Sequence, residues 1–188
     1  MNRKQVIEVA AQLFLIRGYA FTSMDDVMRE SQVSKSNIYY HFKSKEELLL
    51  AAVEYWIERY EAAFFALLGQ AERSVEERVY AFLHELTAGI EERECQGGCP
   101  FISFYIQAPD QAVQVKQKIT GFFTELQPML AKLFQQGLKR NEFRRGIGAE
   151  QAAALFIAAM EGALVLAETT GRSAIVEETA QHFFSMLR

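Results

Sequence analysis

Hydrophobic residues recur at helical spacing along nearly the whole chain. In the segment from about residue 4 to residue 17, Ile7, Ala10 and Phe14 share one face, and Gly18 then ends the pattern. A much longer segment after Asp110 repeats the same spacing over several turns. No run alternates with a period of two between hairpin turns, which argues against a sheet. The pattern predicts an all-α fold of about nine helices.

Residues with the chemistry of helix ends place the predicted boundaries. The expected N-caps are Thr22 or Ser23, Ser34, Ser44, Ser74 and Asp110. Pro100 suits the first turn of a short helix that ends before Pro109, and Pro128 is expected to kink the long helix that follows. Glycines at 146, 148 and 171 separate the last two helices from their neighbours.

Composition narrows the class of protein. Half of the 188 residues are hydrophobic and only three are proline, so a folded core is expected. The longest apolar run, residues 152–160, is too short to span a membrane, and the first residues lack the apolar stretch of a signal peptide. Two cysteines are too few for a disulfide framework or a structural zinc site. We therefore expect a soluble, cytoplasmic protein with no membrane partner, no metal and no cofactor.

The charge is distributed unevenly. Residues 1–45 hold seven Lys and Arg against four acids, a balance of +3, while the remaining residues hold 13 against 20, a balance of −7. A net charge of −4 argues against a general binder of polyanions. A basic head on an acidic body is typical of a protein that contacts DNA at one place.

Residues 22–42 predict two short helices joined by a tight turn. In the second of them, Ile38 and Phe42 lie four positions apart and are expected to face inward. The residues between and before them then form an exposed polar face: Lys35, Ser36, Asn37, Tyr40 and His41. Such a helix suits the major groove of DNA, where an Asn side chain can bond adenine through two hydrogen bonds. The competing interpretation is a helical hairpin with solvated polar residues.

The order of residues in this region favours DNA binding. The chain reads A-x-x-L-F-x-x-x-G-Y from Ala10 to Tyr19, T-S-M from Thr22, and VSKSNIYYHFKSKEEL from Val33 to Leu48. This sequence closely resembles the tetracycline-repressor (TetR) family of transcriptional regulators, over about a quarter of the chain. The family usually has a small residue and then glycine in the turn, where Ser31 and Gln32 stand here. Gln32 is therefore expected to adopt a left-handed conformation at some cost in stability.

The resemblance implies a helix-turn-helix DNA-binding domain over residues 1–45. It is followed by a helical ligand-binding and dimerisation domain over residues 46–188. Ser36 and Asn37 are expected to meet base edges, and the remaining contacts are expected to meet phosphates. The complete set of expected DNA contacts is Thr22, Ser23, Lys35, Ser36, Asn37, Tyr39, Tyr40, His41 and Lys45. The expected DNA is double-stranded and palindromic.

The body of the chain is rich in aromatic residues, which ordinarily fill a core. Proteins of the resembled family hold an inducer among the equivalent helices, which implies a small apolar or aromatic effector here. The expected ligand contacts are Trp56, Tyr60, Phe64, His84, Phe101, Phe104, Tyr105, Phe122 and Phe123. For His84, an ordinary core or surface histidine is the competing interpretation.

Small residues are spaced four apart on the predicted eighth helix, so that another helix can approach closely. With the ninth helix they are expected to form half of a four-helix contact in a homodimer, as in the resembled family. The expected interface residues are Ala154, Ala158, Gly162, Phe183 and Leu187. A two-fold pair of recognition helices reads a palindrome with half-sites about 34–36 Å apart.

These features predict a repressor that a ligand releases from its operator, and they leave alternatives open. Cys99 lies just before a helix N-terminus, which can lower the pKa of a thiol, so a redox or electrophile sensor with Cys95 as resolving partner is one alternative; a structural, unreactive cysteine is the favoured interpretation. An activator, or a ligand-binding protein whose head has lost its role, remains open as well. No metalloprotease, P-loop, nucleophile-elbow or dinucleotide motif is present, so we do not expect an enzyme.

Overall fold

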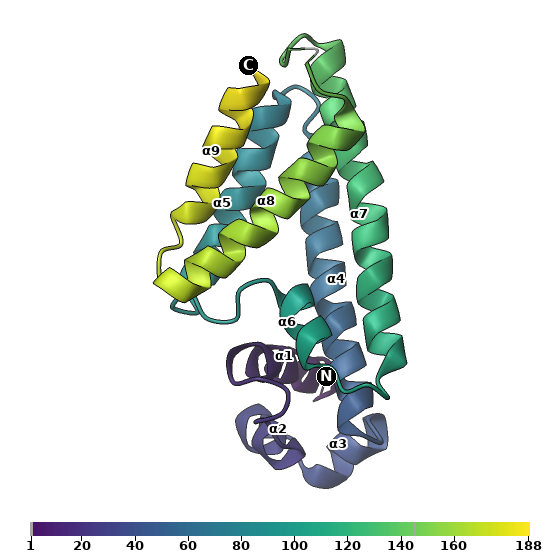
Figure 1. The fold of residues 1–188 in the computed structure, drawn as a ribbon. Helices are drawn as coiled ribbons and strands as arrows, with labels where there is room; N and C mark the ends of the chain where they lie inside the picture. The colour runs from purple at the N-terminus through teal and green to yellow at the C-terminus, as the bar shows by residue number, and fades with distance from the viewer. Residues whose placement is uncertain (1, 145) are drawn as a thin grey trace. The chain divides into compact units, whose positions relative to one another are not determined.

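Nine α-helices and no strand make up the part of the chain that the computed structural model describes, residues 2–144 and 146–188 (Figure 1). Their bounds are α1 Asn2–Ile16, α2 Met24–Ser31, α3 Lys35–His41, α4 Lys45–Gly69, α5 Val75–Glu91, α6 Pro100–Gln107, α7 Val113–Lys139, α8 Ala149–Thr170 and α9 Ile175–Leu187. The predicted all-α fold and the number of helices are confirmed.

Contacts divide the chain into two compact units. The first unit comprises Met1–Tyr60 and Pro100–Gly121, and the second comprises Glu61–Cys99 and Phe122–Arg188. Helices α4 and α7 each contribute residues to both units. The first unit is larger than the DNA-binding domain expected from the sequence. That the DNA-binding domain ends near residue 45 stays a prediction.

In the first unit, α1 packs against α2, α3 and α6 (Figure 1). The residues that bind these helices together are apolar and lie at the spacing predicted from the sequence. The side chains of Ile7, Phe14, Val27, Ile38 and Phe42 are all buried. A head of this size has a small core, so the extra apolar area that α6 supplies stabilises it.

The turn between α2 and α3 contains the predicted left-handed residue. Gln32 ends α2 with φ 56° and ψ 25°, and its side chain is exposed. A residue with a Cβ atom is strained in this region by about 1–2 kcal/mol, because Cβ approaches the backbone carbonyl. The expectation drawn from the absence of glycine in this turn is confirmed.

Replacing Gln32 by glycine is expected to stabilise the protein by about 0.5–1 kcal/mol. Glycine removes the strain of the left-handed backbone, and part of that gain is offset by the greater freedom of glycine in the unfolded chain. Chemical denaturation of both proteins measures the difference. The matched control is Gln117→Gly inside α7, which is expected to destabilise by about 1 kcal/mol. Equal or lower stability of the Gln32→Gly protein would contradict the strain argument.

In the second unit, α9 packs against α5 and α8, and phenylalanine rings form the centre of the core. The ring of Phe134 lies 5.7 Å from those of Phe156 and Phe183, measured between centroids, and 6.2 Å from that of Phe143. Phe184 also belongs to this cluster. Edge-on and tilted contacts of this kind add to the stability gained from burying the rings.

One charged side chain is enclosed in the second unit. Arg78 on α5 is 0% exposed, and it donates hydrogen bonds to the Ser74 carbonyl oxygen and to Oε1 of Gln136 on α7. Its Nη1 has no hydrogen-bond partner, and no ion pair joins it to a carboxylate among the described residues. Because a buried charge without a counter-charge is destabilising, its two hydrogen bonds are a strong constraint on how α5 meets α7.

Two helix starts differ in detail from expectation. Asp110 does not cap α7, which begins only at Val113; Asp110 instead lies 3.2 Å from Nζ of Lys116. Ser44 accepts a hydrogen bond from the Glu47 amide as predicted, whereas the Glu47 carboxylate accepts from the Lys43 amide. By contrast, the predicted capping box of Ser74 and Glu77 is present in full. Pro128 lies inside α7, which continues past it.

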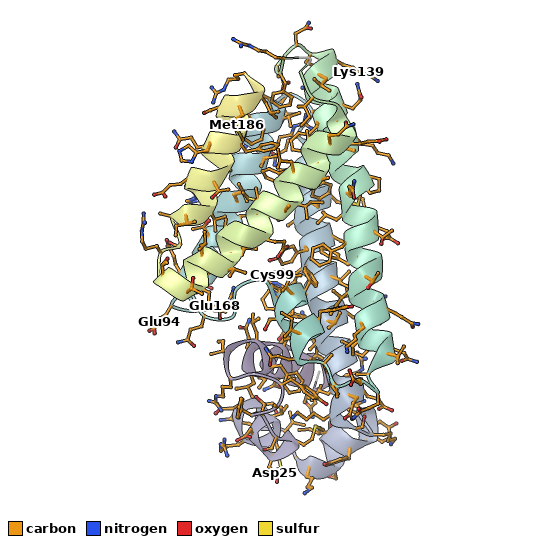
Figure 2. All side chains as sticks on the ribbon, in the orientation of Figure 1. Asp25, Glu94, Cys99, Lys139, Glu168 and Met186 are labelled. Atoms are coloured by element: carbon orange, nitrogen blue, oxygen red, sulfur yellow. The ribbon has the colours of Figure 1, made fainter. Side chains whose placement is uncertain are left out.

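Helix α8 is long and apolar enough to cross a membrane by length and composition alone, and 39% of the segment that qualifies is buried within the chain. Core helices of soluble proteins meet the same criterion. Four large apolar side chains of α8 and α9 remain exposed: Leu155, Val165, Leu166 and Met186 (Figure 2 labels Met186). These residues form an uncovered apolar face of the second unit.

Candidate nucleic-acid interface

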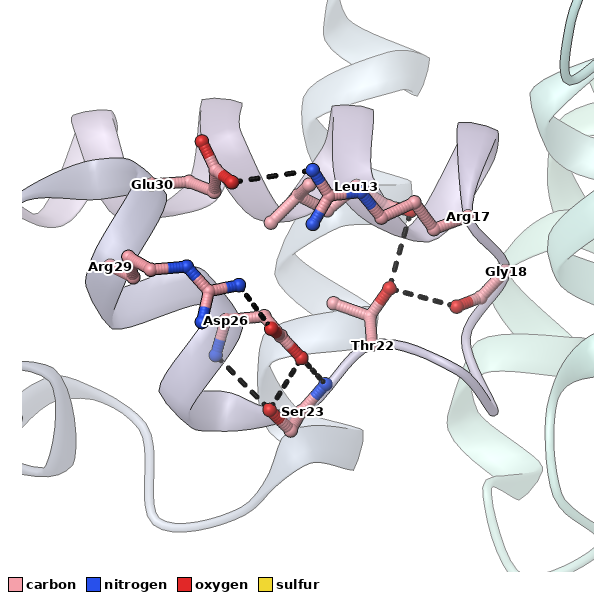
Figure 3. A network of polar contacts seen from close by, with 8 residues as sticks. All are labelled: Leu13, Arg17, Gly18, Thr22, Ser23, Asp26, Arg29 and Glu30. Carbon is pink, nitrogen blue, oxygen red and sulfur yellow. Dashed lines mark hydrogen bonds and ion pairs between the residues drawn. The ribbon is translucent and has the colours of Figure 1, made fainter.

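The start of α2 is held by a reciprocal pair of hydrogen bonds. The Asp26 amide donates to Oγ of Ser23, and the Asp26 carboxylate accepts from the Ser23 amide (Figure 3). Arg29 donates to the same carboxylate. Hydrogen bonds from the Ser23 side chain and amide, followed by that from Arg29, lower the pKa of Asp26. Ser23 itself remains exposed, as expected for a residue at the DNA surface.

Thr22, expected to contact DNA, is buried. Its side chain is 1% exposed, and its hydroxyl lies 2.9 Å from the Gly18 carbonyl oxygen and 3.3 Å from that of Leu13 (Figure 3). The hydroxyl is therefore committed to the end of α1 and is not available to a phosphate. Thr22 fixes the loop between α1 and α2, and its side chain is not a DNA contact.

Helix α3 presents the predicted polar face. Ile38 and Phe42 are 1% and 3% exposed, whereas Tyr40 is 75% exposed. The other expected contacts on this helix are exposed or half-buried: Lys35, Ser36, Asn37, Tyr39 and His41. The interpretation that the helix carries its polar side chains outward, on two apolar anchors, agrees with this burial pattern.

Two side chains on this face have constraints that the sequence did not reveal. Lys35 lies 3.6 Å from Oδ1 of Asp25 and over the ring of Tyr39. Oδ1 of Asn37 is buried and has no hydrogen-bond partner among the described residues. A bidentate contact between Asn37 and adenine therefore requires this side chain to rotate.

At the start of α4, Lys45 is half-buried beside Tyr19. Its Nζ lies 4.1 Å from the centroid of the Tyr19 ring, within the range of a cation–π interaction. The Tyr19 hydroxyl donates to Oε1 of Glu46 at 3.1 Å. Burial lowers the pKa of Lys45, while burial and the Glu46 carboxylate raise the pKa of Tyr19. Tyr19 was not among the residues expected at the site, although it follows Gly18 in the quoted motif.

The expected ligand contacts are distributed over both units. Trp56, Tyr60, Phe101, Phe104 and Tyr105 belong to the first unit, in which the rings of Tyr60 and Phe101 are 5.0 Å apart. Phe64, Phe122 and Phe123 belong to the second unit, in which the rings of Phe122 and Phe123 are 5.4 Å apart. Phe101 and Phe104 are fully buried, whereas Tyr105 is 44% exposed. Their role in binding an effector stays a prediction.

His84 is corrected as a ligand contact. Its side chain is 84% exposed, and its Nδ1 lies 3.5 Å from Oε1 of Glu177 on α9. A side chain in this position faces solvent and cannot line an enclosed apolar site. The competing interpretation, an ordinary surface histidine, describes it.

The two cysteines are both buried, and they flank a glycine-containing loop (Figure 2 labels Cys99). Sγ of Cys99 lies 3.5 Å from Oε1 of Glu161 on α8. Burial raises the pKa of Glu161, while the hydrogen bond from Cys99 lowers it. Burial also restricts the access of dissolved oxidants, and a sensing role for these thiols stays a prediction.

Surface depressions occur in the second unit. A groove of about 630 Å³ follows α7 and the start of α8. Six of its nine lining residues are polar or charged, but apolar atoms supply most of the exposed surface: Gln127, Pro128, Ala131, Lys132, Gln135, Gln136, Lys139, Ala149 and Glu150. A hollow of about 310 Å³ is mainly apolar, with Leu155, Phe183, Met186 and Leu187 among its lining residues. No group of three or more potential metal ligands occurs within residues 2–144 and 146–188.

The expected dimer residues separate into two groups. Ala154, Ala158 and Gly162 are exposed, which leaves their face of α8 open to another helix. Phe183 and Leu187 are only 2% and 6% exposed, because they belong to the chain's own core. This corrects the expectation that they form the contact surface; they lie beneath it. The exposed residues that the sequence reading missed are Leu155, Val165, Leu166 and Met186.

Comparison with known families matches most of the chain. Residues 6–52 match the model described as "Bacterial regulatory proteins, tetR family". Residues 75–183 match that described as "Tetracyclin repressor-like, C-terminal domain". The biofilm operon icaADBC negative transcriptional regulator IcaR of Staphylococcus aureus (strain Newman) is 26% identical over 130 residues. The match spans 69% of this chain and 66% of IcaR, just under two thirds of that relative.

Solved structures agree with these matches. A TetR transcriptional regulator from Chloroflexus aurantiacus is 32% identical, with a TM-score of 0.80, over 98% of this chain and 92% of that one. The regulatory protein TetR from Rhodobacter sphaeroides has a TM-score of 0.89 at 18% identity, over 99% and 98% of the two chains, and so supports the fold alone. The family match over residues 75–183 and the Chloroflexus relative show that this chain belongs to the TetR family of DNA-binding transcriptional regulators, which are not enzymes.

Proposed function

We propose that this protein is a homodimeric repressor that binds a palindromic operator through the polar face of α3 and leaves it when a small apolar or aromatic effector binds. The observation that carries the proposal is the burial pattern of α3. Ile38 and Phe42 are buried, while Tyr40 and its polar neighbours face solvent. The similar protein IcaR is a negative transcriptional regulator, which supports repression.

The proposed contacts divide by chemistry. Ser36 and Asn37 lie early in α3 and meet base edges, whereas Tyr39, Tyr40, His41 and Lys45 meet phosphates. At the start of α2, the exposed Ser23 borders a further phosphate position. The amides of Ser23 and Asp26 are already bonded within the capping pair, so a phosphate there is limited to the remaining first-turn amides.

The proposed dimer contact is the uncovered apolar face of the second unit. Ala154, Ala158 and Gly162 allow a second helix to approach closely, and larger apolar residues surround them. Burying exposed Leu155, Val165, Leu166 and Met186 against a second copy removes apolar surface from water. The same burial accounts for the apolar character of α8 in a cytoplasmic protein.

The proposed effector site uses the aromatic residues of the first unit, on α4 and α6: Trp56, Tyr60, Phe101, Phe104 and Tyr105. Aromatic side chains suit a flat, apolar ligand, and few charges stand among them. A bound effector acts only if it binds one conformation of the dimer more tightly than the other. A compound of this class is expected to raise the melting temperature and to release operator DNA at the same concentrations. Compounds that raise the melting temperature but leave operator DNA bound contradict the mechanism.

Substitutions of Tyr40 and Lys45 by alanine are each expected to weaken operator binding by about tenfold. The operator is first selected from random double-stranded DNA with the wild-type protein, and affinity is then measured by fluorescence anisotropy. Loss of the Lys45 phosphate contact is also expected to reduce the slope of log K against log salt by about 0.9. Tyr40→Ala carries no change of charge and is expected to leave the slope unchanged.

Lys139→Ala is the matched control for this experiment. Lys139 ends α7 in the second unit and is exposed, so its loss removes one positive charge outside the proposed interface. Its affinity is expected to stay within twofold of wild type. If wild type selects no sequence, the proposed function is wrong; if it does and neither Tyr40→Ala nor Lys45→Ala weakens binding, the assigned contact face is wrong.

A further inference from the structure

A side chain of α6 is bonded directly to the loop that follows α1. The Tyr19 amide donates a hydrogen bond of 2.6 Å to Oε1 of Gln107, the last residue of α6. These residues are 88 positions apart in the sequence and lie in the same compact unit. The amide after a helix C-terminus ordinarily bonds a carbonyl of the helix's own last turn. Here a side chain from another helix satisfies it instead.

The side-chain amide of Gln107 is closely surrounded and bonded at both ends. Gly18 has φ 90°, and a Cβ atom on it would lie 3.0 Å from Oε1 of Gln107. The other end of the Gln107 amide is also bonded, because Nε2 donates to Oγ of Ser103 at 2.8 Å. Ser103 lies one helical turn earlier on α6. The amide group of Gln107 is thus fixed at both ends, and its position follows that of α6.

The opposite side of Tyr19 meets the residue proposed to contact DNA. Its hydroxyl donates to Glu46, and its ring lies beneath Nζ of Lys45. The Tyr19 side chain is buried, so its ring has little freedom to move independently of its backbone. A continuous set of contacts therefore runs from α6, through Gln107 and Tyr19, to Lys45 at the start of α4.

We propose that Gln107 is a positioning residue, which holds Tyr19 and thereby Lys45 in the place required for its phosphate contact. A displacement of the C-terminal end of α6 then withdraws the acceptor from the Tyr19 amide and loosens Lys45. This inference rests on the proposed function only in assigning Lys45 to a phosphate. It adds that the hydrogen bond between α6 and the loop after α1 controls that phosphate contact.

The first test is independent of DNA. Amide hydrogen exchange measured by NMR is expected to show a protected Tyr19 amide in wild type, and exchange at least about tenfold faster in Gln107→Ala, because the acceptor of its hydrogen bond is removed. The Arg17 amide, bonded to the Leu13 carbonyl oxygen within α1, is the internal control and is expected to be unchanged. Gln107→Glu keeps an acceptor and is expected to restore the protection of Tyr19.

The second test is a double-mutant cycle on operator binding. Gln107→Ala is expected to weaken binding about three- to tenfold, with a reduced salt slope like that of Lys45→Ala. In the Lys45→Ala background, the same change is expected to weaken binding by less than twofold, since the residue through which Gln107 acts is already absent. Gln107→Glu is expected to bind DNA as wild type does. A merely structural role would instead give additive losses and leave the salt slope unchanged.

The outcomes separate the two proposals. If wild type selects no DNA sequence, the proposed function fails, while the exchange experiment still decides whether the bond exists. If Lys45→Ala weakens binding but Gln107→Ala binds like wild type, Gln107 has no positioning role. Equal exchange of the Tyr19 amide in wild type and Gln107→Ala, or full additivity in the cycle, overturns the inference as well.

Discussion

Gly162→Arg is expected to turn the dimer into monomers and to reduce operator affinity by at least about 100-fold, equivalent to about 2.7 kcal/mol. Gly162 is exposed on α8, and a Cβ atom there would meet no heavy atom of the described chain within 4 Å. The folded chain therefore accepts a larger side chain. A second helix packed about 8–10 Å away does not, because the arginine occupies its place and would bury a charge. Sedimentation velocity measures the change of mass.

Gly121→Arg is the control for this substitution. Gly121 is also inside a helix, and a Cβ atom there likewise meets nothing within 4 Å. Both proteins lose a helical glycine and gain the same charge, so their intrinsic effects on stability are matched. Gly121→Arg is expected to remain dimeric with unchanged far-ultraviolet circular dichroism. A dimeric Gly162→Arg protein would show that α8 does not form the contact.

Phe134→Ala is expected to destabilise the protein by about 3–5 kcal/mol and to lower the melting temperature by roughly 10 °C. Phe134 is 1% exposed, and its ring contacts those of Phe143, Phe156, Phe183 and Phe184. Removing it leaves a cavity among rings that come from α8, α9 and the segment after α7, which limits how far they can close in. Chemical denaturation at one fixed protein concentration measures the loss.

Phe65→Ala is the matched control, since Phe65 is 63% exposed on α4. Its substitution is expected to change stability by no more than about 0.5 kcal/mol. Comparable losses for the two variants would contradict the placement of Phe134 at the centre of the core. The protein concentration must be the same for every variant, because the proposed dimer makes apparent stability depend on concentration.

The head of the protein was predictable because its signals are local. The anchors Ile38 and Phe42 lie one helical turn apart, and Ser23 stands directly before the helix that it caps. Even the strained Gln32 followed from the absence of glycine at one turn position. Each of these inferences needs only the geometry of a few consecutive residues, which the sequence specifies almost completely.

The body was less predictable because periodicity identifies an apolar face without identifying what covers it. Phe183 and Leu187 share the apolar face of α9, and only the structure shows that their own chain covers them. His84 has no local pattern that separates a surface position from a pocket. Thr22 was assigned to DNA from its position in a motif, whereas its hydroxyl bonds the carbonyl oxygens at the end of α1.

Contacts between distant segments left no signal that could be read from one sequence. Gln107 is an ordinary polar residue at the end of an apolar helix, and its bond to Tyr19 spans 88 positions. Arg78 occupies a helical position that suits an exposed arginine equally well, yet it is enclosed and bonded to Gln136, 58 positions away. Such contacts depend on how helices are arranged, which periodicity alone does not determine.

The exposed aliphatic residues of α8 affect how operator binding depends on protein concentration. If Leu155, Val165 and Leu166 are shielded only by a second copy, titrations at very low protein concentration will contain free subunits. Below the assembly threshold, operator occupancy will then rise with the square of subunit concentration. Titration curves will steepen there, and a gene-regulatory response built on this protein will be more sensitive to its abundance below that threshold than above it.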